Sequence, residues 1–260
     1  MALLPSPPDP RAVMAGDGVP IATYDLGDPD GEVVLAVHGF ASSAFANFVA
    51  TGWVRELQRA GRRVIAIDQR GHGASGKPHD PAAYSMALLV EDVQTVLDTY
   101  LVDEVDLVGY SLGARVGWHA LLELGPGTIR RAVLGGIPDG DPLTRFRVDE
   151  ARARIERGTA VTDRLTQAYL TMAQLTPGND LTALVSLVEG MRGGLQPDPA
   201  DPPQQPVLFA AGSEDPILEA TRRLAAATPR SELVELAGRN HFNAPTARAF
   251  RDAAIAFLAR

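Results

Sequence analysis

The sequence predicts an α/β protein, with a mostly parallel sheet flanked by helices, and three observations lead to that prediction. Short apolar segments of strand length alternate along the chain with amphipathic segments of helical length. The clearest apolar segments contain almost no polar residues, as expected of strands buried on both faces. Between residues 138 and 206 the alternation stops, and only helical patterns continue. We therefore expect an α/β core formed by residues 1–137 and 207–260, with a small helical cap inserted at residues 138–206.

Length and composition limit the function. The chain has 260 residues, which suits one α/β domain, and its net charge of −8 argues against a nucleic-acid partner, because phosphate binding needs a basic surface. It has no cysteine, which excludes disulfides, thiolate catalysis and metal sites with cysteine ligands. Residues 1–10 lack the basic and apolar parts of a signal peptide, and no segment reaches the roughly 20 apolar residues of a membrane span. We expect a cytoplasmic protein with a small-molecule substrate and no membrane partner, and the oligomeric state is unknown at this stage.

The strands follow from runs of Val, Leu, Ile and Ala. The Pro-rich start of the chain is interpreted as a loose arm, and from about Ile21 onward the chain alternates apolar runs with helical patterns. The segment Leu233–Leu236 is more polar and is expected nearer an edge of the sheet. The clearest strands are expected at Val33–Val37, Val64–Ile67, Val105–Gly109, Ala132–Gly135 and Val207–Ala211.

The helices follow from apolar residues at spacings of three and four, which place those residues on one helical face. In the core this predicts helices at Phe48–Ala60, Met86–Tyr100, Leu112–Leu124, Ile217–Ala227 and Thr246–Ala259. A long loop without structure would be implausible in the interval from Pro138 to Pro206. There the patterns predict cap helices near Leu143–Arg157, Thr162–Leu175 and Asp180–Met191, followed by the Pro-rich segment Gln196–Pro206.

Ser111 is the candidate nucleophile. It is the centre of a G-x-S-x-G pattern, Gly109 to Gly113, which lies directly between an apolar strand and a helical pattern. The tight strand-to-helix turn forces the serine into a strained conformation and crowds the backbone, so the residues two before and two after it must lack side chains. The serine would then lie at a helix N-terminus, where the helix dipole favours developing negative charge. An ordinary Gly-flanked turn with a capping serine is the alternative interpretation.

A second candidate element is His38-Gly39-Phe40, which follows the strand at Val33–Val37. Glycine lets the chain bend here, so that the next backbone N–H, that of Phe40, can point at a reacting carbonyl oxygen. The N–H of Leu112, just after the nucleophile, is the expected second donor of this oxyanion hole. We interpret His38 itself as structural, because it lies on the bend.

His241 is the candidate base, since a serine hydroxyl needs a group with the pKa of histidine to remove its proton. Of the five histidines, only His241 falls in a loop late in the chain, as a Ser…Asp…His order requires. His119 lies eight residues past Ser111 on a helix and cannot fold back onto it. His72 and His79 belong to the Gly-rich loop after Val64–Ile67.

Asp215 is the favoured acid, because a buried carboxylate in the loop after the Val207–Ala211 strand would orient the imidazole and stabilise the imidazolium. Its neighbour Glu214 would point another way, since adjacent side chains diverge. Asp139, after the Ala132–Gly135 strand, is the competing candidate. For each aspartate, a loop or helix cap is the alternative role.

The stretch Asp68–Gly76 is rich in glycine but lacks the G-x-G-x-x-G and G-K-[ST] patterns of phosphate loops. We interpret it as a turn held by the side chains of Asp68 and Arg70.

Taken together, these motifs resemble the α/β-hydrolase superfamily from about Ile21 to Ala259. The resemblance implies an eight-stranded sheet, a cap over the active site, and catalysis without a metal or an organic cofactor. It also implies that Ser111, Asp215 and His241 form the triad and that the amides of Phe40 and Leu112 form the oxyanion hole. The motifs that carry it are HGF at 38–40, D-x-R-G-x-G-x-S at 68–75, GYSLG at 109–113, GSEDP at 212–216 and NHF at 240–242.

Departures from individual subfamilies narrow the expected activity. Epoxide hydrolases and haloalkane dehalogenases look similar but use an aspartate nucleophile, where this chain has Ser111. Cofactor-free haloperoxidases usually carry Trp in place of Phe40. Hydrolases of C–C bonds in ring-fission products tend to have Trp at Phe242 and Gly at Ala114. Carboxylic-ester hydrolysis is left as the best-supported class.

The hypothesis is therefore a serine hydrolase, esterase-like, that cleaves an ester or lactone through an acyl-enzyme. One alternative is a C–C bond hydrolase, which needs a cationic pocket that Arg145, Arg147 or Arg192 could supply. Another is a ligand-binding protein with little turnover on the same fold. The cap residues that could line the pocket, or simply pack on the core, are Phe146, Leu165, Tyr169, Met172 and Leu175.

Overall fold

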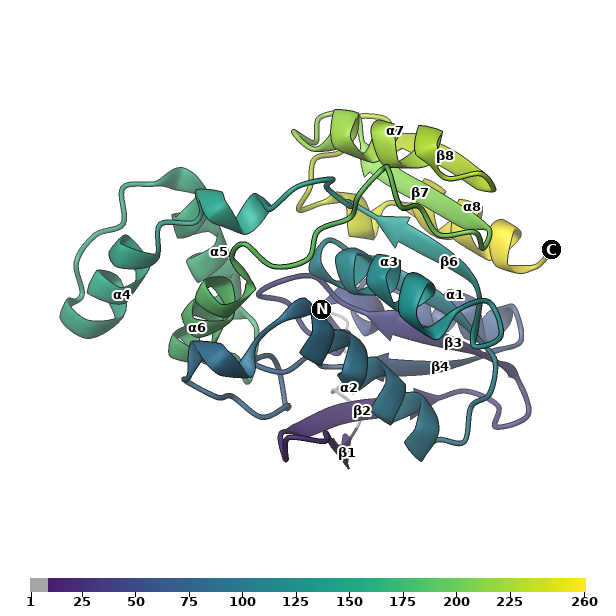
Figure 1. Cartoon of the computed structure of the whole chain (residues 1–260), viewed down its shortest axis with the longest axis horizontal. Coiled ribbons are helices and arrows are strands. Elements are labelled where there is room, and N and C mark those ends of the chain that lie inside the picture. Colours follow the sequence, from purple (N-terminus) through teal and green to yellow (C-terminus); the bar gives the residue numbers. More distant parts are fainter. Residues whose placement is uncertain (1–8) are drawn as a thin grey trace, which may run out of the picture.

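Eight strands form one sheet in the order β1-β2-β4-β3-β5-β6-β7-β8 in the computed structural model, which describes residues 9–260 (Figure 1). The pairs β1–β2 and β2–β4 are antiparallel, and all the other neighbouring strands are parallel. The predicted fold class and the eight-stranded sheet are therefore confirmed. The strands are β1 (Arg11–Met14), β2 (Pro20–Leu26), β3 (Glu32–Val37), β4 (Arg62–Ile67), β5 (Val105–Tyr110), β6 (Ile129–Gly135), β7 (Val207–Gly212) and β8 (Ser231–Leu236).

Strand β1 corrects the expectation of a loose arm at the start of the chain. Arg11–Met14 pairs with β2, with Ala12 opposite Ala22, although only Val13 of its four residues is buried. So short an edge strand has too little hydrophobic alternation to be recognised without its partner. The part of the expected arm at residues 1–8 lies outside the described residues.

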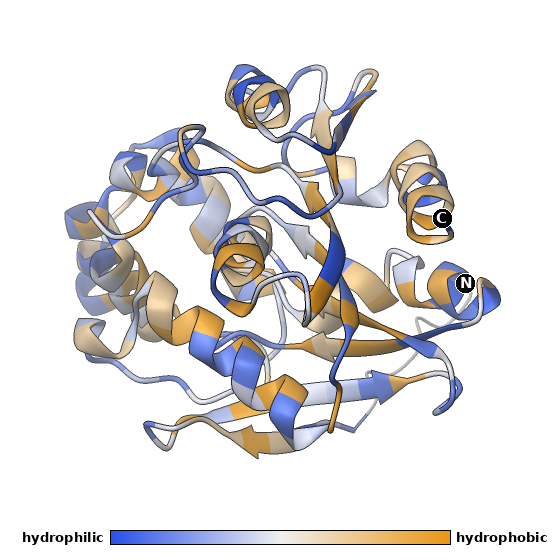
Figure 2. Ribbon diagram, turned by 45° about the vertical axis from the view of Figure 1, so that its right-hand side comes forward, coloured by the Kyte–Doolittle hydropathy of each residue, from blue (hydrophilic) through white to orange (hydrophobic). Residues whose placement is uncertain are grey.

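The sheet divides the core into two layers, because successive side chains along a strand point to opposite faces. In β3, Leu35 and Val37 pack into one cluster with helices α2 (Met86–Thr99) and α3 (Leu112–Leu124), whereas Val34 and Ala36 face the other way. That second face is covered by α1 (Trp53–Arg59) and α8 (Arg248–Leu258). Figure 2 shows apolar strands in the interior and polar residues on the outer sides of the helices.

The core helices agree with the predicted ranges within about two residues, except for the first. The expected helix at 48–60 is divided into a π-helical turn, η1 (Phe45–Val49), and α1. Gly52 lies between them in the left-handed region at a φ of 85°, which a continuous right-handed helix cannot include. The remaining core helices are α7 (Leu218–Ala227) and the short 3₁₀ turns η2 (Pro81–Ala83) and η4 (Ala244–Thr246).

Residues 138–206 contain the 3₁₀ turn η3 (Pro142–Arg145) and the helices α4 (Val148–Arg157), α5 (Arg164–Leu175) and α6 (Leu181–Met191). The carboxylates of Asp163 and Asp180 cap α5 and α6 by accepting hydrogen bonds from backbone amides of the first turn. The three helices lie together beside the sheet, at the left of Figure 1. We call residues 138–206 the insertion.

Candidate active site

Ser111 lies at the turn between β5 and α3, with a φ of 52° and a ψ of −111°. A Cβ atom on Gly109 would lie 2.4 Å from the carbonyl oxygen of Gly113, and one on Gly113 would lie 2.0 Å from that of Val37. Both contacts are impossible, so the two glycines are required by close packing around the turn, as the motif predicts. The Ser111 side chain caps no amide of α3, which leaves its hydroxyl available for other partners.

The structure brings His241 and Asp215 to Ser111, although the three residues come from separate loops. His241 Nε2 lies 2.9 Å from Ser111 Oγ, and its Nδ1 lies 2.8 Å from Asp215 Oδ2. The other carboxylate oxygen of Asp215 accepts the amide of Ile217 at 3.1 Å, which fixes the carboxylate plane. The Asp215 side chain is buried, and a buried carboxylate beside Nδ1 favours the tautomer in which Nε2 accepts a proton.

The competing candidates lie elsewhere. Asp139 forms an ion pair with Arg223, with 2.6 Å between the closest atoms, and Glu214 is exposed. His79 pairs with Asp180 at the surface. His72 and His119 are buried, and neither lines the cavity beside Ser111.

Tyr110, the residue before Ser111, connects the loops that carry Ser111 and His241. Its hydroxyl donates a hydrogen bond of 2.6 Å to the carbonyl oxygen of His241, and its ring centroid lies 5.5 Å from that of the imidazole. Burial raises the pKa of the Tyr110 phenol well above its ordinary value, so the hydroxyl remains a donor. Sequence reasoning missed this contact, because the G-x-S-x-G pattern leaves its second position unspecified.

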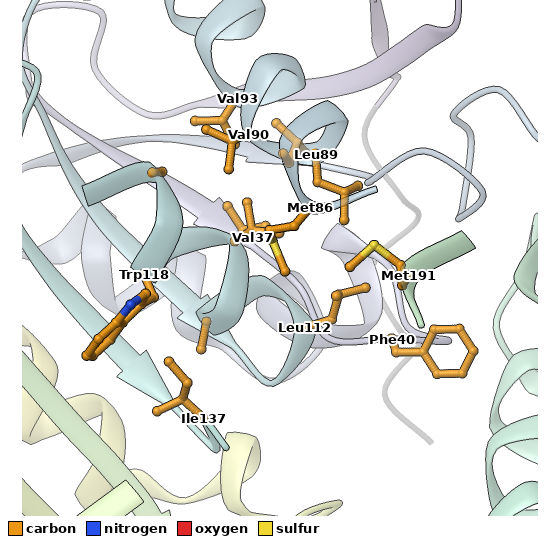
Figure 3. Close-up of a cluster of buried hydrophobic side chains, with 14 of the residues drawn as sticks. Val37, Phe40, Met86, Leu89, Val90, Val93, Leu112, Trp118, Ile137 and Met191 are labelled. Atoms are coloured by element: carbon orange, nitrogen blue, oxygen red, sulfur yellow. The ribbon is translucent and has the colours of Figure 1, made fainter. Parts of the chain in front are cut away.

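The amide of Phe40 belongs to a tight turn in which the N–H of Ser42 donates to the carbonyl of Gly39 at 3.2 Å. Within residues 9–260, no protein acceptor is hydrogen-bonded to the amide of Phe40 or to that of Leu112, at the N-terminus of α3. The side chains of both residues are buried, in the cluster that also contains Met86 and Met191 (Figure 3). The side chains thus anchor these two residues while their amides stay available to an external acceptor.

His38 is fully buried at the bend after β3 and has a structural set of contacts. Its Nε2 accepts the amide N–H of Gln69 at 3.0 Å, and its Nδ1 lies 2.7 Å from the carbonyl of Gly39. Burial lowers the pKa of His38, which favours the neutral ring that these two bonds need.

A cavity of about 200 Å³ opens beside Ser111 and His241. Two of the expected cap residues, Tyr169 and Met172, line it from α5, while Phe146 is buried behind Tyr169 with its ring centroid 6.2 Å from that of Phe40. Leu175 points away and is 78% exposed. The other lining residues are Gly39, Phe40, Ser42, Ala46, Asn47, Thr51, Tyr110, Thr176, Phe242, Pro245 and Thr246.

The cavity lining contains no Asp, Glu, Lys or Arg among the residues that the structure describes. Arg145, Arg147 and Arg192 are all exposed and take no part in it. Arg192 instead donates to the carbonyl of Phe146 at the surface of the insertion.

Across residues 9–260, no three His, Asp or Glu side chains converge as the ligands of a metal ion would. In the same range, no helix combines the length and the apolar character that a membrane crossing demands.

Residues 32–153 match the model of a family described as having the alpha/beta hydrolase fold. Among curated proteins, this chain is similar to epoxide hydrolase B of Mycobacterium tuberculosis, with 40% identity over 94 residues. That match covers 35% of this chain and only 25% of the relative, so it spans a quarter of that protein's length.

Two solved structures resemble nearly the whole chain. A hydrolase from Pseudomonas aeruginosa PA01 aligns with a TM-score of 0.78 and 23% identity, over 96% of this chain and 98% of the other. An enol-lactonase from Burkholderia xenovorans LB400 aligns with a TM-score of 0.77 and 21% identity, over 96% and 100% of the two chains. At these identities the likeness establishes the shared fold.

Proposed function

We propose that this chain, which has the α/β-hydrolase fold, hydrolyses a carboxylic ester or lactone. In this proposal Ser111 is the nucleophile, His241 the general base and Asp215 the acid that orients the base. The observation that carries the proposal is the continuous hydrogen-bonded series from Ser111 Oγ through His241 to Asp215, beside two amides without protein acceptors.

The mechanism follows from these positions. Ser111 Oγ attacks the carbonyl carbon while His241 Nε2 takes the hydroxyl proton. The amides of Phe40 and Leu112 donate to the oxyanion of the tetrahedral intermediate, which is where such donors act most strongly. His241 then gives the proton to the departing alcohol. A water molecule, activated by the same imidazole, releases the acyl group and restores the serine.

The cavity supports a neutral, compact substrate. Its lining is largely apolar, and no charged side chain is present to pair with an ionic group, whose burial without a partner would be costly. A volume of about 200 Å³ is small for a ligand site, which favours short acyl and alcohol groups.

We further propose that the insertion acts as the cap of this cavity. Tyr169, Met172 and Thr176 of the insertion face the core residues Phe40 and Phe242 across it. In that position they would shield the reacting groups from bulk solvent, while the hydrolytic water still reaches the acyl-enzyme, and would select the shape of the substrate.

The alternatives have less support from the site. A C–C bond hydrolase needs a cation for the carboxylate of its substrate, and Arg145, Arg147 and Arg192 do not line the cavity. The resemblance implies an aspartate nucleophile for an epoxide hydrolase, and this chain has Ser111 at that position. Covalent labelling and an ester-hydrolysis assay distinguish catalysis from a ligand-binding role with little turnover.

The test is covalent labelling of the purified protein with a fluorophosphonate, with the modified peptide located by mass spectrometry. We expect label at Ser111, its loss in Ser111→Ala, and a fall in nitrophenyl-ester hydrolysis by a factor of about 10³–10⁶. Ser85→Ala, at the N-cap of α2 and away from the cavity, is the control that should keep both label and activity. A folded wild-type protein with neither label nor ester hydrolysis would contradict the proposal and favour a binding role.

A further inference from the structure

The turn that presents the Phe40 amide contains a strained residue. Ala41 has a φ of 61° and is almost fully buried. Ala41 is the third residue of the turn from Gly39 to Ser42. In turns with a positive φ only at the third residue, Gly and Asn are favoured at that position. An alanine keeps this conformation only where its surroundings hold it.

Two side chains hold Ala41, one on each side of its backbone. His72 Nε2 accepts the N–H of Ala41 at 3.0 Å, and Asn179 Nδ2 donates to its carbonyl oxygen at 3.0 Å. Burial lowers the pKa of His72 well below its ordinary value, which keeps the ring neutral so that Nε2 remains an acceptor. His72 belongs to the core, whereas Asn179 lies between α5 and α6 of the insertion.

Asn179 uses both ends of its amide. While Nδ2 donates to Ala41, Oδ1 accepts the N–H of Gly73 at 2.8 Å. The insertion approaches the core closely at this point, because a Cβ atom on Gly178 would lie 2.5 Å from the carbonyl oxygen of Gly73. One side chain therefore ties the insertion to the Gly-rich loop after β4 and to the turn that carries the Phe40 amide.

The same turn has a second support from the core. Asn47 Oδ1 accepts the N–H of Gly39 at 3.1 Å, and Asn47 comes from η1. The first residue of the turn is thus held by the core alone, whereas the residue after Phe40 is held in part by the insertion.

We propose that Asn179 is a positioning residue for the oxyanion hole: by holding Ala41 in its left-handed conformation, it aims the Phe40 amide at the developing oxyanion. Docking of the insertion then prepares the active site for catalysis, in addition to enclosing it. This inference rests on the proposed ester or lactone hydrolysis and adds the residue through which the insertion acts on it.

The experiment compares four variants of the full chain on one nitrophenyl ester. Asn179→Ala removes both hydrogen bonds, and Asn179→Asp keeps an acceptor for Gly73 but loses the donor to Ala41. Ala41→Gly is tested alone and combined with Asn179→Ala. It removes the side chain whose steric strain would otherwise drive residue 41 out of the left-handed conformation. Gln167→Ala is the matched control, because it removes an exposed amide of α5 that bonds only within its own helix, to Thr171.

We expect kcat to fall by about 10-fold in both Asn179 variants, with KM changed by less than about twofold. Loss of one oxyanion-hole donor lowers kcat by roughly 10²–10³, and a donor that is only misaimed should lower it by less. Adding Ala41→Gly to Asn179→Ala should raise kcat about fivefold, since glycine adopts the left-handed conformation without steric cost. If Asn179 only docks the insertion, Asn179→Ala should raise KM, Asn179→Asp should keep the wild-type kcat, and adding Ala41→Gly should not raise kcat. That pattern would overturn the inference.

Amide hydrogen exchange of the turn supplies a readout that does not need turnover. We expect faster exchange at Ser42 in Asn179→Ala than in Gln167→Ala, and equal exchange would overturn the inference. If the wild-type protein neither takes the fluorophosphonate label nor hydrolyses esters, the proposed function fails, and the inference fails with it. If the wild type is active and Asn179→Ala matches the control, only the inference fails.

Discussion

The loops at the carboxyl ends of the strands and the insertion meet at one cavity, but different interactions hold them in place. The loops follow strands such as β5 and β7, in which every residue is buried, and side chain-to-backbone hydrogen bonds lock them. In the insertion, α5 and α6 are capped by Asp163 and Asp180, whereas α4 has no side-chain cap at its N-terminus and buries only Val148 and Ala151. Its polar connection to the turn that carries the Phe40 amide is made by Asn179.

The loops and the insertion therefore determine different properties of the proposed site. The groups that the proposed mechanism needs held within about 0.5 Å, such as Ser111 and His241, lie on loops that follow strands of the sheet. Side chains that shape the cavity, such as Tyr169 and Met172, come from the insertion. Substitutions in the loops, and at Asn179, which supports one of them, should therefore lower kcat. Substitutions of the insertion side chains that line the cavity should instead change substrate preference.

The largest expected effect tests the loop side of this comparison. Asp215→Asn should lower kcat for ester hydrolysis by about 10⁴, because an amide cannot stabilise the imidazolium and favours the wrong tautomer. KM should change little. The control is Asp139→Asn, which removes the competing candidate and its ion pair with Arg223. It should retain kcat within about twofold, because this pair does not line the cavity. Equal losses in the two variants would show that the acid has been assigned wrongly.

A smaller effect is expected on the insertion side. Met172→Ala enlarges the cavity, and it should shift the ratio of kcat/KM for longer over shorter acyl groups by about 10-fold, the typical value of a few methylene contacts. Leu175→Ala, on the same helix but 78% exposed, is the matched control and should leave the ratio unchanged. The measurement is a series of nitrophenyl esters with increasing acyl length. A lower kcat at an unchanged ratio would break the distinction between loops and insertion.

The smallest expected effect concerns the part of acid stability that depends on histidines, which should arise in the core, because residues 138–206 contain no histidine. Burial, with a contribution from the charge of Arg115, lowers the pKa of His119 on α3 to about 4. Between that value and an unfolded pKa of about 6.5, the unfolded chain binds more protons. His119 therefore contributes stability that is complete above about pH 6.5 and is lost as the pH falls toward 4.

We expect the free energy of unfolding of the wild type to fall more steeply over this range than that of His119→Gln. The difference in slope should be about 1 kcal/mol per pH unit, which corresponds to the uptake of one proton. Urea unfolding at several pH values measures both slopes, and comparison of slopes removes any constant effect of the substitution. Equal slopes of the unfolding free energy against pH in the two proteins would show that His119 is protonated equally in the folded and unfolded states.

Local patterns predicted the strand-to-helix turn at Ser111, because part of the constraint there is local. The crowding at Gly109 comes from Gly113 and Ala114, within a few residues of Ser111, whereas that at Gly113 comes from the carbonyl of Val37 on β3. In both cases a side chain would clash with backbone, so a glycine stands in the sequence. The buried strands were predictable for a similar reason, since burial on both faces demands apolar residues at every position. The edge strand β1 and the break at Gly52 were missed, because the first depends on a partner and the second on the packing of η1.

The sequence by itself thus determined the fold class, the strand-to-helix turn at Ser111 and the order in which the candidate residues occur along the chain. Only the tertiary structure placed Asp215, and not Asp139, beside His241. Both aspartates follow parallel strands, and the outcome depends on β7 lying beside β8, whose loop carries His241. The tie from Tyr110 to His241 and that from Asn179 to Ala41 were equally out of reach of the sequence. Each joins residues more than a hundred positions apart, and a contact of that kind leaves no periodicity, because it arises from packing between elements rather than from the conformation of any one of them.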